Sequence, residues 1–197
     1  FKAEGLAPQA ISAIIKADLE RSGQFKMLDV PGDKLDDTSR PPLTDWKSKA
    51  DALVLGSVTM LADGRYDIRF RLWDTLKGAD QGGQSLVVTA GDLRLGAHRA
   101  ADFIYEKLTG EKGAFATRIA YVSKAGKHYT LNVADADGEG VQASLTSPAS
   151  IISPAWSPDG TKVAYTAFVQ RAKSGKRNAD MFLIEPSNPD KATLLSY

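Results

Sequence analysis

The sequence predicts an α+β domain, with a mixed sheet and helices on one face, followed by an all-β region of truncated β-propeller blades. Two observations support this prediction. Residues 1–112 mix helix-like and strand-like apolar periodicities, whereas residues 113–197 contain strand-like runs separated by polar turns. The second region also repeats its order of strands, which is typical of the first one to two blades of a propeller.

The composition is that of a folded globular chain. Of its 197 residues, 43% are hydrophobic, enough for a real core, and the net charge of +1 creates no strong attraction to nucleic acid or an anionic membrane. The absence of cysteine excludes disulfides and thiolate metal sites, and no apolar run approaches the roughly 18 residues that span a bilayer. Because the chain begins at Phe1 without Met, we expect a processed or trimmed protein whose signal peptide has been removed.

The first helix is predicted from the spacing of its apolar residues. Pro8 suits the first turn, Gly23 suits a left-handed C-terminal cap, and one stripe is formed by Ile11, Ile14, Ile15 and Leu19. A short strand is expected at residues 25–28, and a loop rich in proline and charge at residues 31–42.

A meander of strands between two helices is expected next. Thr44 is predicted to cap a short helix through Lys49, and Asp92 to open a longer helix that ends at Gly110. The strands between these helices are expected at residues 51–61, 65–75 and 84–90.

The strand at residues 65–75 places a row of arginines on one face. Arg65, Arg69 and Arg71 alternate with apolar residues, as on a sheet with one wet face. We interpret the row as that solvated face; an anion site is the alternative. Trp73 falls on the same face and is expected to pack beside arginine stems.

Three strand signals recur in the same order after residue 117. Tyr121 in "RIAYV" and Tyr165 in "KVAYT" are 44 positions apart, and "YTLNVADADG" and "ASLTS" correspond to "DMFLIEPSNP" and "ATLLS". A period of about 44 residues lies in the range of four-stranded propeller blades. The second copy is longer by "RAKSGKRN", in which Arg171, Lys173, Lys176 and Arg177 are expected to form a solvated loop.

The stretch "SPAWSPDGTKVAYTAF" is predicted to be a hairpin of the second blade. Pro158 and Asp159 suit a type I turn, and Gly160 the left-handed position that follows it. Trp156 is expected to pack between neighbouring sheets rather than to contact a ligand. Since a propeller needs about four to eight blades to close, fewer than two blades predict a fragment of a longer ring; docking of the open face on another molecule is the alternative.

No catalytic, cofactor or metal site is predicted. "GEGVQA" fits a dinucleotide-binding pattern but leads into a strand instead of a helix, and "DADGEG" begins like a calcium loop but has Thr146 where the bidentate Glu belongs. A hairpin turn is therefore expected there, with a weak cation site at Asp135 and Asp137 as the alternative. His98 and His128 have no partner at metal-ligand spacing, and we expect a structural or surface role for His98.

Longer stretches resemble the TolB family of the Tol–Pal system. The resemblance rests on "YEKLTGEKGAFATRIAYV" and "ISPAWSPDGTKVAYTAF", together with "ISAIIKADLERSGQFKMLD" and "ADALVLGSVTMLADGRYDIRFRLWDT". It covers nearly the whole chain. It implies that Gly110, Gly113 and Phe115 form the link between a mixed α/β domain and a six-bladed propeller, with a hinge or packing role for Phe115.

The resemblance also implies a function. It implies a periplasmic, non-enzymatic hub that binds the lipoprotein Pal and signals to TolA, supports outer-membrane integrity, constriction during cell division and protein transport, and is exploited in colicin import. The TolA-facing tail and a first strand are expected before Phe1, and most of the Pal-facing surface after Tyr197. The rival interpretation is the accessory propeller of a serine peptidase, which carries similar Trp-Ser-Pro-Asp-Gly hairpins.

Overall fold

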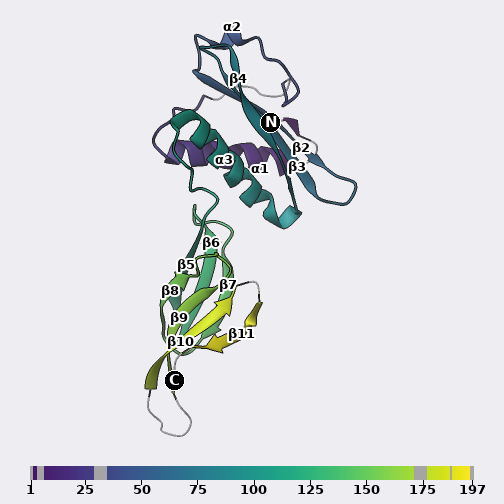
Figure 1. The fold of residues 1–197 in the computed structure, drawn as a ribbon. Coiled ribbons are helices and arrows are strands. Elements are labelled where there is room, and N and C mark those ends of the chain that lie inside the picture. Colours follow the sequence, from purple (N-terminus) through teal and green to yellow (C-terminus); the bar gives the residue numbers. More distant parts are fainter. Residues whose placement is uncertain (1, 4–6, 29–34, 171–176, 187, 196–197) are drawn as a thin grey trace. The chain divides into compact units, whose positions relative to one another are not determined.

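The computed structural model describes residues 2–3, 7–28, 35–170, 177–186 and 188–195. The chain divides into two compact units, Phe1–Ala116 and Thr117–Tyr197. The prediction of an α+β region followed by incomplete all-β blades is confirmed (Figure 1). The predicted boundary between residues 112 and 113 stays a prediction.

The first unit is a mixed four-stranded sheet covered by two helices. Its elements are β1 (Lys2–Ala3), α1 (Ala7–Arg21), α2 (Leu43–Trp46), β2 (Ala52–Met60), β3 (Tyr66–Asp74), β4 (Ala79–Val88), η1 (Ala90–Asp92) and α3 (Leu93–Thr109). The strand order is β1-β2-β3-β4, with β1 parallel to β2 and the other pairs antiparallel. A short strand therefore lies at Lys2–Ala3, and the strand expected before Phe1 stays a prediction.

The core of the first unit lies between the helices and one face of the sheet. The helices contribute Ile11, Ile15, Leu19, Ala97, Ala100, Ala101 and Ile104, and the strands Val58, Ile68, Phe70, Leu72 and Val88. The stripe predicted for α1 supplies three of these residues, which explains why this short helix is stable: its apolar face is buried against the sheet and α3.

Three local predictions for the first unit were wrong in detail. Residues 25–28 are not a strand, because the sheet offers them no partner: Phe25 instead packs edge-on against Tyr105 of α3. Thr44 does not cap α2; it lies within a helix that begins at Leu43 after Pro42. The third long strand begins at Ala79, earlier than expected, and a register shift at Leu72/Trp73 accommodates its polar first half.

The second unit consists of two antiparallel sheets. The first sheet has the order β5 (Arg118–Ala125), β6 (His128–Asp135), β7 (Gln142–Ser147), and the second β8 (Ile151–Trp156), β9 (Val163–Gln170), β10 (Arg177–Glu185), β11 (Asn188–Leu194). Among the described residues, β8 has no counterpart in the first sheet, whereas β5, β6 and β7 match β9, β10 and β11 in order. The strands thus follow the repeat seen in the sequence.

One apolar core holds the two sheets of the second unit together. Its buried members are Leu131, Ile151, Val163, Tyr165, Ala167 and Ile184. Other large apolar side chains of the same strands are exposed: the exposed fraction is 42% for Ile119, 43% for Ile152 and 50% for Met181. Each exposed side chain lies on a strand, as expected for faces that further blades would cover.

Candidate functional site

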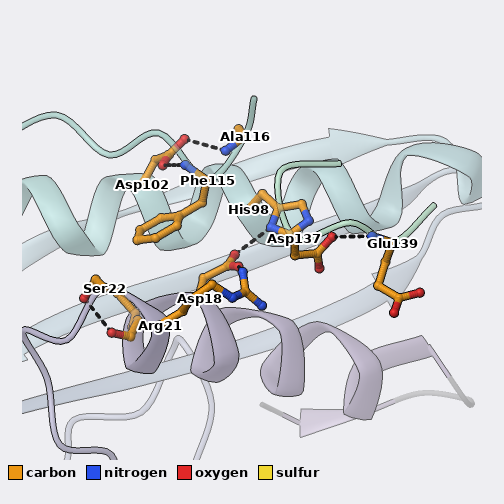
Figure 2. Close-up of polar contacts among 10 residues, drawn as sticks. Asp18, Arg21, Ser22, His98, Asp102, Phe115, Ala116, Asp137 and Glu139 are labelled. Atoms are coloured by element: carbon orange, nitrogen blue, oxygen red, sulfur yellow. Dashed lines mark hydrogen bonds and ion pairs between the residues drawn. The ribbon is translucent and has the colours of Figure 1, made fainter. Parts of the chain in front are cut away.

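The link between the predicted domains is fastened to α3 by one carboxylate. Gly110 ends α3 in the left-handed conformation, with φ of 80°. Asp102 accepts hydrogen bonds from the backbone amides of two residues that follow Gly110 by five and six positions, Phe115 (2.7 Å, to Oδ1) and Ala116 (3.1 Å, to Oδ2) (Figure 2). The side chain of a mid-helix residue therefore holds these two amides against α3.

The side chain of Phe115 and the absence of a side chain at Gly113 also hold the link against α3. Phe115 packs against the core of the first unit, with its ring 5.6 Å from that of Tyr105 in an edge-on arrangement. A Cβ at Gly113 would lie 2.3 Å from Oδ1 and 2.6 Å from Cα of Asp102, so only glycine fits this close approach. Of the three predicted link residues, Gly110 ends α3, Gly113 lies against Asp102 of α3, and Phe115 packs against Tyr105 of α3. The sequence did not reveal Asp102 as their partner.

A buried hydrogen bond between two side chains joins α1 to α3. Nδ1 of His98 lies 2.6 Å from Oδ2 of Asp18, and each side chain is only 1% exposed. The other oxygen of Asp18 accepts a hydrogen bond from Arg21 at 3.1 Å (Figure 2). His98 is buried and not on the surface, and a structural role for it stays a prediction. Its carboxylate partner is 80 residues away in the sequence and was therefore missed.

The arginine row is neutralised by aspartates. Arg69 donates from Nε to Asp67 at 2.7 Å, and Asp67, which is 4% exposed, also accepts from Ser85 at 2.7 Å. Arg71 lies 3.2 Å from Asp80, and Arg65 2.8 Å from Asp63. A small cleft of about 200 Å³ beside the row is also lined by Asp37, so the local charge disfavours an anion. This result favours the interpretation of the row as the solvated face of the sheet. Trp73, which was predicted to lie on the same face, is buried.

The Trp-Ser-Pro-Asp-Gly stretch forms the turn between β8 and β9. Asp159 accepts hydrogen bonds from the hydroxyl of Ser157 (2.5 Å) and from the amide and hydroxyl of Thr161 (3.0 and 2.8 Å). These bonds, that of Ser157 first, lower the pKa of Asp159 from 3.8 to about 2. Gly160 has φ of 68°, a conformation that favours glycine. With Pro158 between Ser157 and Asp159, this network is that of a rigid turn.

The aromatic residues of the repeat lie in or beside the second core. Tyr165 is buried in β9 and stacks on Phe182, with ring centroids 5.5 Å apart, and burial raises its pKa. Trp156 is half-buried against the same core, and Tyr121 is half-buried in β5. Of the predicted basic loop, Arg171, Lys173 and Lys176 lie outside the described residues, whereas Arg177 begins β10, where it pairs with Gln170 of β9.

The sequence motifs with alternative chemistry lie in one turn. Gly138 and Gly140 connect β6 to β7 and precede a strand, so no helix stands ready to bind a dinucleotide. The amide of Glu139 donates to Asp137 within this turn (Figure 2). A cation site at Asp135 and Asp137 stays a prediction. No helix among the described residues combines the length and apolar content needed to cross a bilayer.

The comparisons with known proteins agree with this geometry. Residues 1–81 match the family model of the TolB amino-terminal domain, and residues 105–175 that of the TolB beta propeller domain. The chain is 61% identical over 172 residues to the Tol-Pal system protein TolB of Albidiferax ferrireducens and 59% identical to that of Polaromonas naphthalenivorans. Each alignment covers 87% of this chain and 40% of the relative, so the chain spans about two fifths of the relatives' length.

A solved structure is similar in fold. The crystal structure of TolB from Acinetobacter baumannii matches with a TM-score of 0.72 at 26% identity, covering 99% of this chain and 58% of that one. Together these matches do not favour the peptidase-accessory interpretation.

Proposed function

Because the chain belongs to the TolB family, we propose that it forms the amino-terminal domain and first blades of a non-enzymatic interaction hub of the Tol–Pal system. The observation that carries the proposal is the order of the parts. A helix-covered mixed sheet precedes two sheets of repeated topology, in the same order as the two TolB family models along the chain. The proposed location is the periplasm.

In the proposed function the two units act as scaffolds for partner proteins. Each unit has its own core, so each presents its surface loops on a preorganised support. The exposed apolar strand faces of the second unit support the proposal that further blades complete a propeller, whose surface binds the lipoprotein Pal. TolA-like envelope proteins, and colicins that use the same system, are the further proposed partners. The cellular role proposed is support of outer-membrane integrity, cell constriction and protein transport.

The test is a pull-down of Pal with the protein extended to the length of its relatives. We expect Pal from the same bacterium to be retained by this full-length protein and lost when the residues from Thr117 onward are deleted. The matched control keeps the propeller and deletes residues 1–116, and should retain Pal. Equal retention of Pal without the propeller would contradict the proposal.

A further inference from the structure

The second unit contains an open groove. It has a volume of about 520 Å³, in the range of small-ligand sites. Its walls come from the turn between β5 and β6, the connection between β7 and β8, and the end of β9. All its lining residues belong to one unit, so the groove is a property of the two packed sheets.

The groove combines cations with aromatic surface. Lys124 and Lys127 line one wall, and Nζ of Lys124 lies 5.3 Å from the ring centroid of Tyr129. Phe168, which is 38% exposed, also lines the groove, together with Pro148. No carboxylate belongs to the lining residues. The surface therefore attracts negative charge and also offers apolar area to a ligand.

Within the described residues, neither lysine of the groove, Lys124 or Lys127, forms an ion pair. By contrast, the exposed cations of the first sheet lie beside aspartates, as in the pairs Arg65–Asp63, Arg71–Asp80 and Lys77–Asp74. The positive charge of the groove is thus available to an incoming ligand.

The walls of the groove are held in place by hydrogen bonds of the main chain. The amide of Phe168 donates to the carbonyl of Ser150 at 2.9 Å, and the amide of Ala149 to the hydroxyl of Ser147 at 3.0 Å. Lys124 and Tyr129 face each other across the β5–β6 hairpin. A groove on such supports is preorganised, which reduces the entropy lost on binding.

We propose that this groove binds an extended acidic segment of a partner protein, with carboxylates beside Lys124 and Lys127 and an apolar side chain between Tyr129 and Phe168. The inference deepens the proposed function and rests on it, since it names the kind of segment that the propeller binds. Single-stranded nucleic acid also prefers cations and aromatic rings, but the near-neutral net charge of +1 and the occupied face of the Tyr129 ring favour an acidic peptide.

The experiment is an NMR titration of the intact chain with the peptide acetyl-Gly-Glu-Leu-Phe-Asp-Gly-amide. We expect saturable shifts of the backbone amides of Gly126, Lys127 and Ala149, and at least a roughly tenfold weaker affinity for the double variant K124E/K127E, because two attractive charges become repulsive. The matched control is K112E/K191E, which makes the same change of charge at two other exposed lysines and should bind as the wild type does.

Three results would overturn the inference. They are equal affinity for the analogue in which Gln and Asn replace Glu and Asp, shifts confined to amides outside the groove, and tighter binding of the oligonucleotide dT6 at the same amides. Pal retained by the full-length protein without peptide binding would reject the groove and leave the proposed function standing. Loss of Pal binding with intact peptide binding would do the reverse.

Discussion

Oδ2 of Asp18 lies 2.6 Å from Nδ1 of His98, and this contact joins the two helices of the first unit inside its core. Both side chains are almost completely shielded from water. In such surroundings the loss of one partner leaves the other buried without its compensating contact, which is costly even where the intact pair adds little net stability.

We therefore expect H98A to lower the free energy of unfolding of the first unit by about 3 kcal/mol. D18A should have a similar effect, and the double variant should cost clearly less than the sum of the two. Urea unfolding followed by a signal from the first unit measures these energies. R99A, which removes an exposed side chain from the same helix, is the control. Equal stability of H98A and R99A would mean that the pair is unimportant.

The close approach of Gly113 to Asp102 predicts that adding one methyl group at Gly113 weakens the hydrogen bonds of the link to Asp102. In G113A the added methyl group would collide with the backbone of Asp102, so the link must move away from α3 and the amides of Phe115 and Ala116 must lose their acceptor. Hydrogen exchange of these two amides should become at least roughly tenfold faster.

The matched controls for the link separate the carboxylate from the glycine. D102N keeps one acceptor oxygen and should accelerate the exchange of one of the two amides more than that of the other. K112A, at an exposed neighbour of Gly113, should leave both amides protected. Unchanged exchange in G113A would show that the link is not held by this contact.

The sequence predicted those features of the fold and of the candidate site that depend on residues close together along the chain. The helix at Ile11–Leu19 and the hairpin at Trp156–Gly160 were predictable, because periodicity and turn chemistry act over a few residues. The contact of Asp18 with His98 was not predictable, because its partners meet only after the helices have packed. The strand expected at residues 25–28 was wrong for the same reason, since a strand needs a neighbour that no local pattern supplies.

The turn after β8 predicts an acidic titration. The pKa of Asp159 is lowered from 3.8 to about 2 by its hydrogen bonds. The ionised carboxylate therefore stabilises the turn fully at a pH above 3.8, and this stabilisation is lost as the pH falls through about 2. Carbon NMR of the carboxyl group should give a midpoint near 2. S157A should raise this midpoint more than replacement of the Thr161 hydroxyl by T161V, because the bond from Ser157 is the larger cause. A wild-type midpoint near 3.8 would refute the network.

In the arginine row, we expect the burial of an aspartate to decide how much its ion pair adds to the free energy of unfolding. Asp67 is buried between Arg69 and Ser85, so D67A should lower the free energy of unfolding by about 2 kcal/mol. Asp80 is exposed beside Arg71, and D80A should cost less than about 1 kcal/mol. Urea unfolding of the two variants makes the comparison. A larger loss in D80A would contradict the assignment of this face as an ordinary solvated surface with one buried carboxylate.

We propose that the sheets of the second unit are successive blades of a longer ring. Met181 of β10 is 50% exposed in this chain and should be covered by the following blade in the full-length protein. Because the chain has no cysteine, M181C can be labelled with a maleimide at a single site, beside the control R65C at an exposed hairpin turn. If a following blade covers this position, labelling of M181C is roughly a hundredfold slower in the full-length protein than in this chain, whereas R65C reacts alike in both. Equal rates for M181C in the two proteins would contradict it.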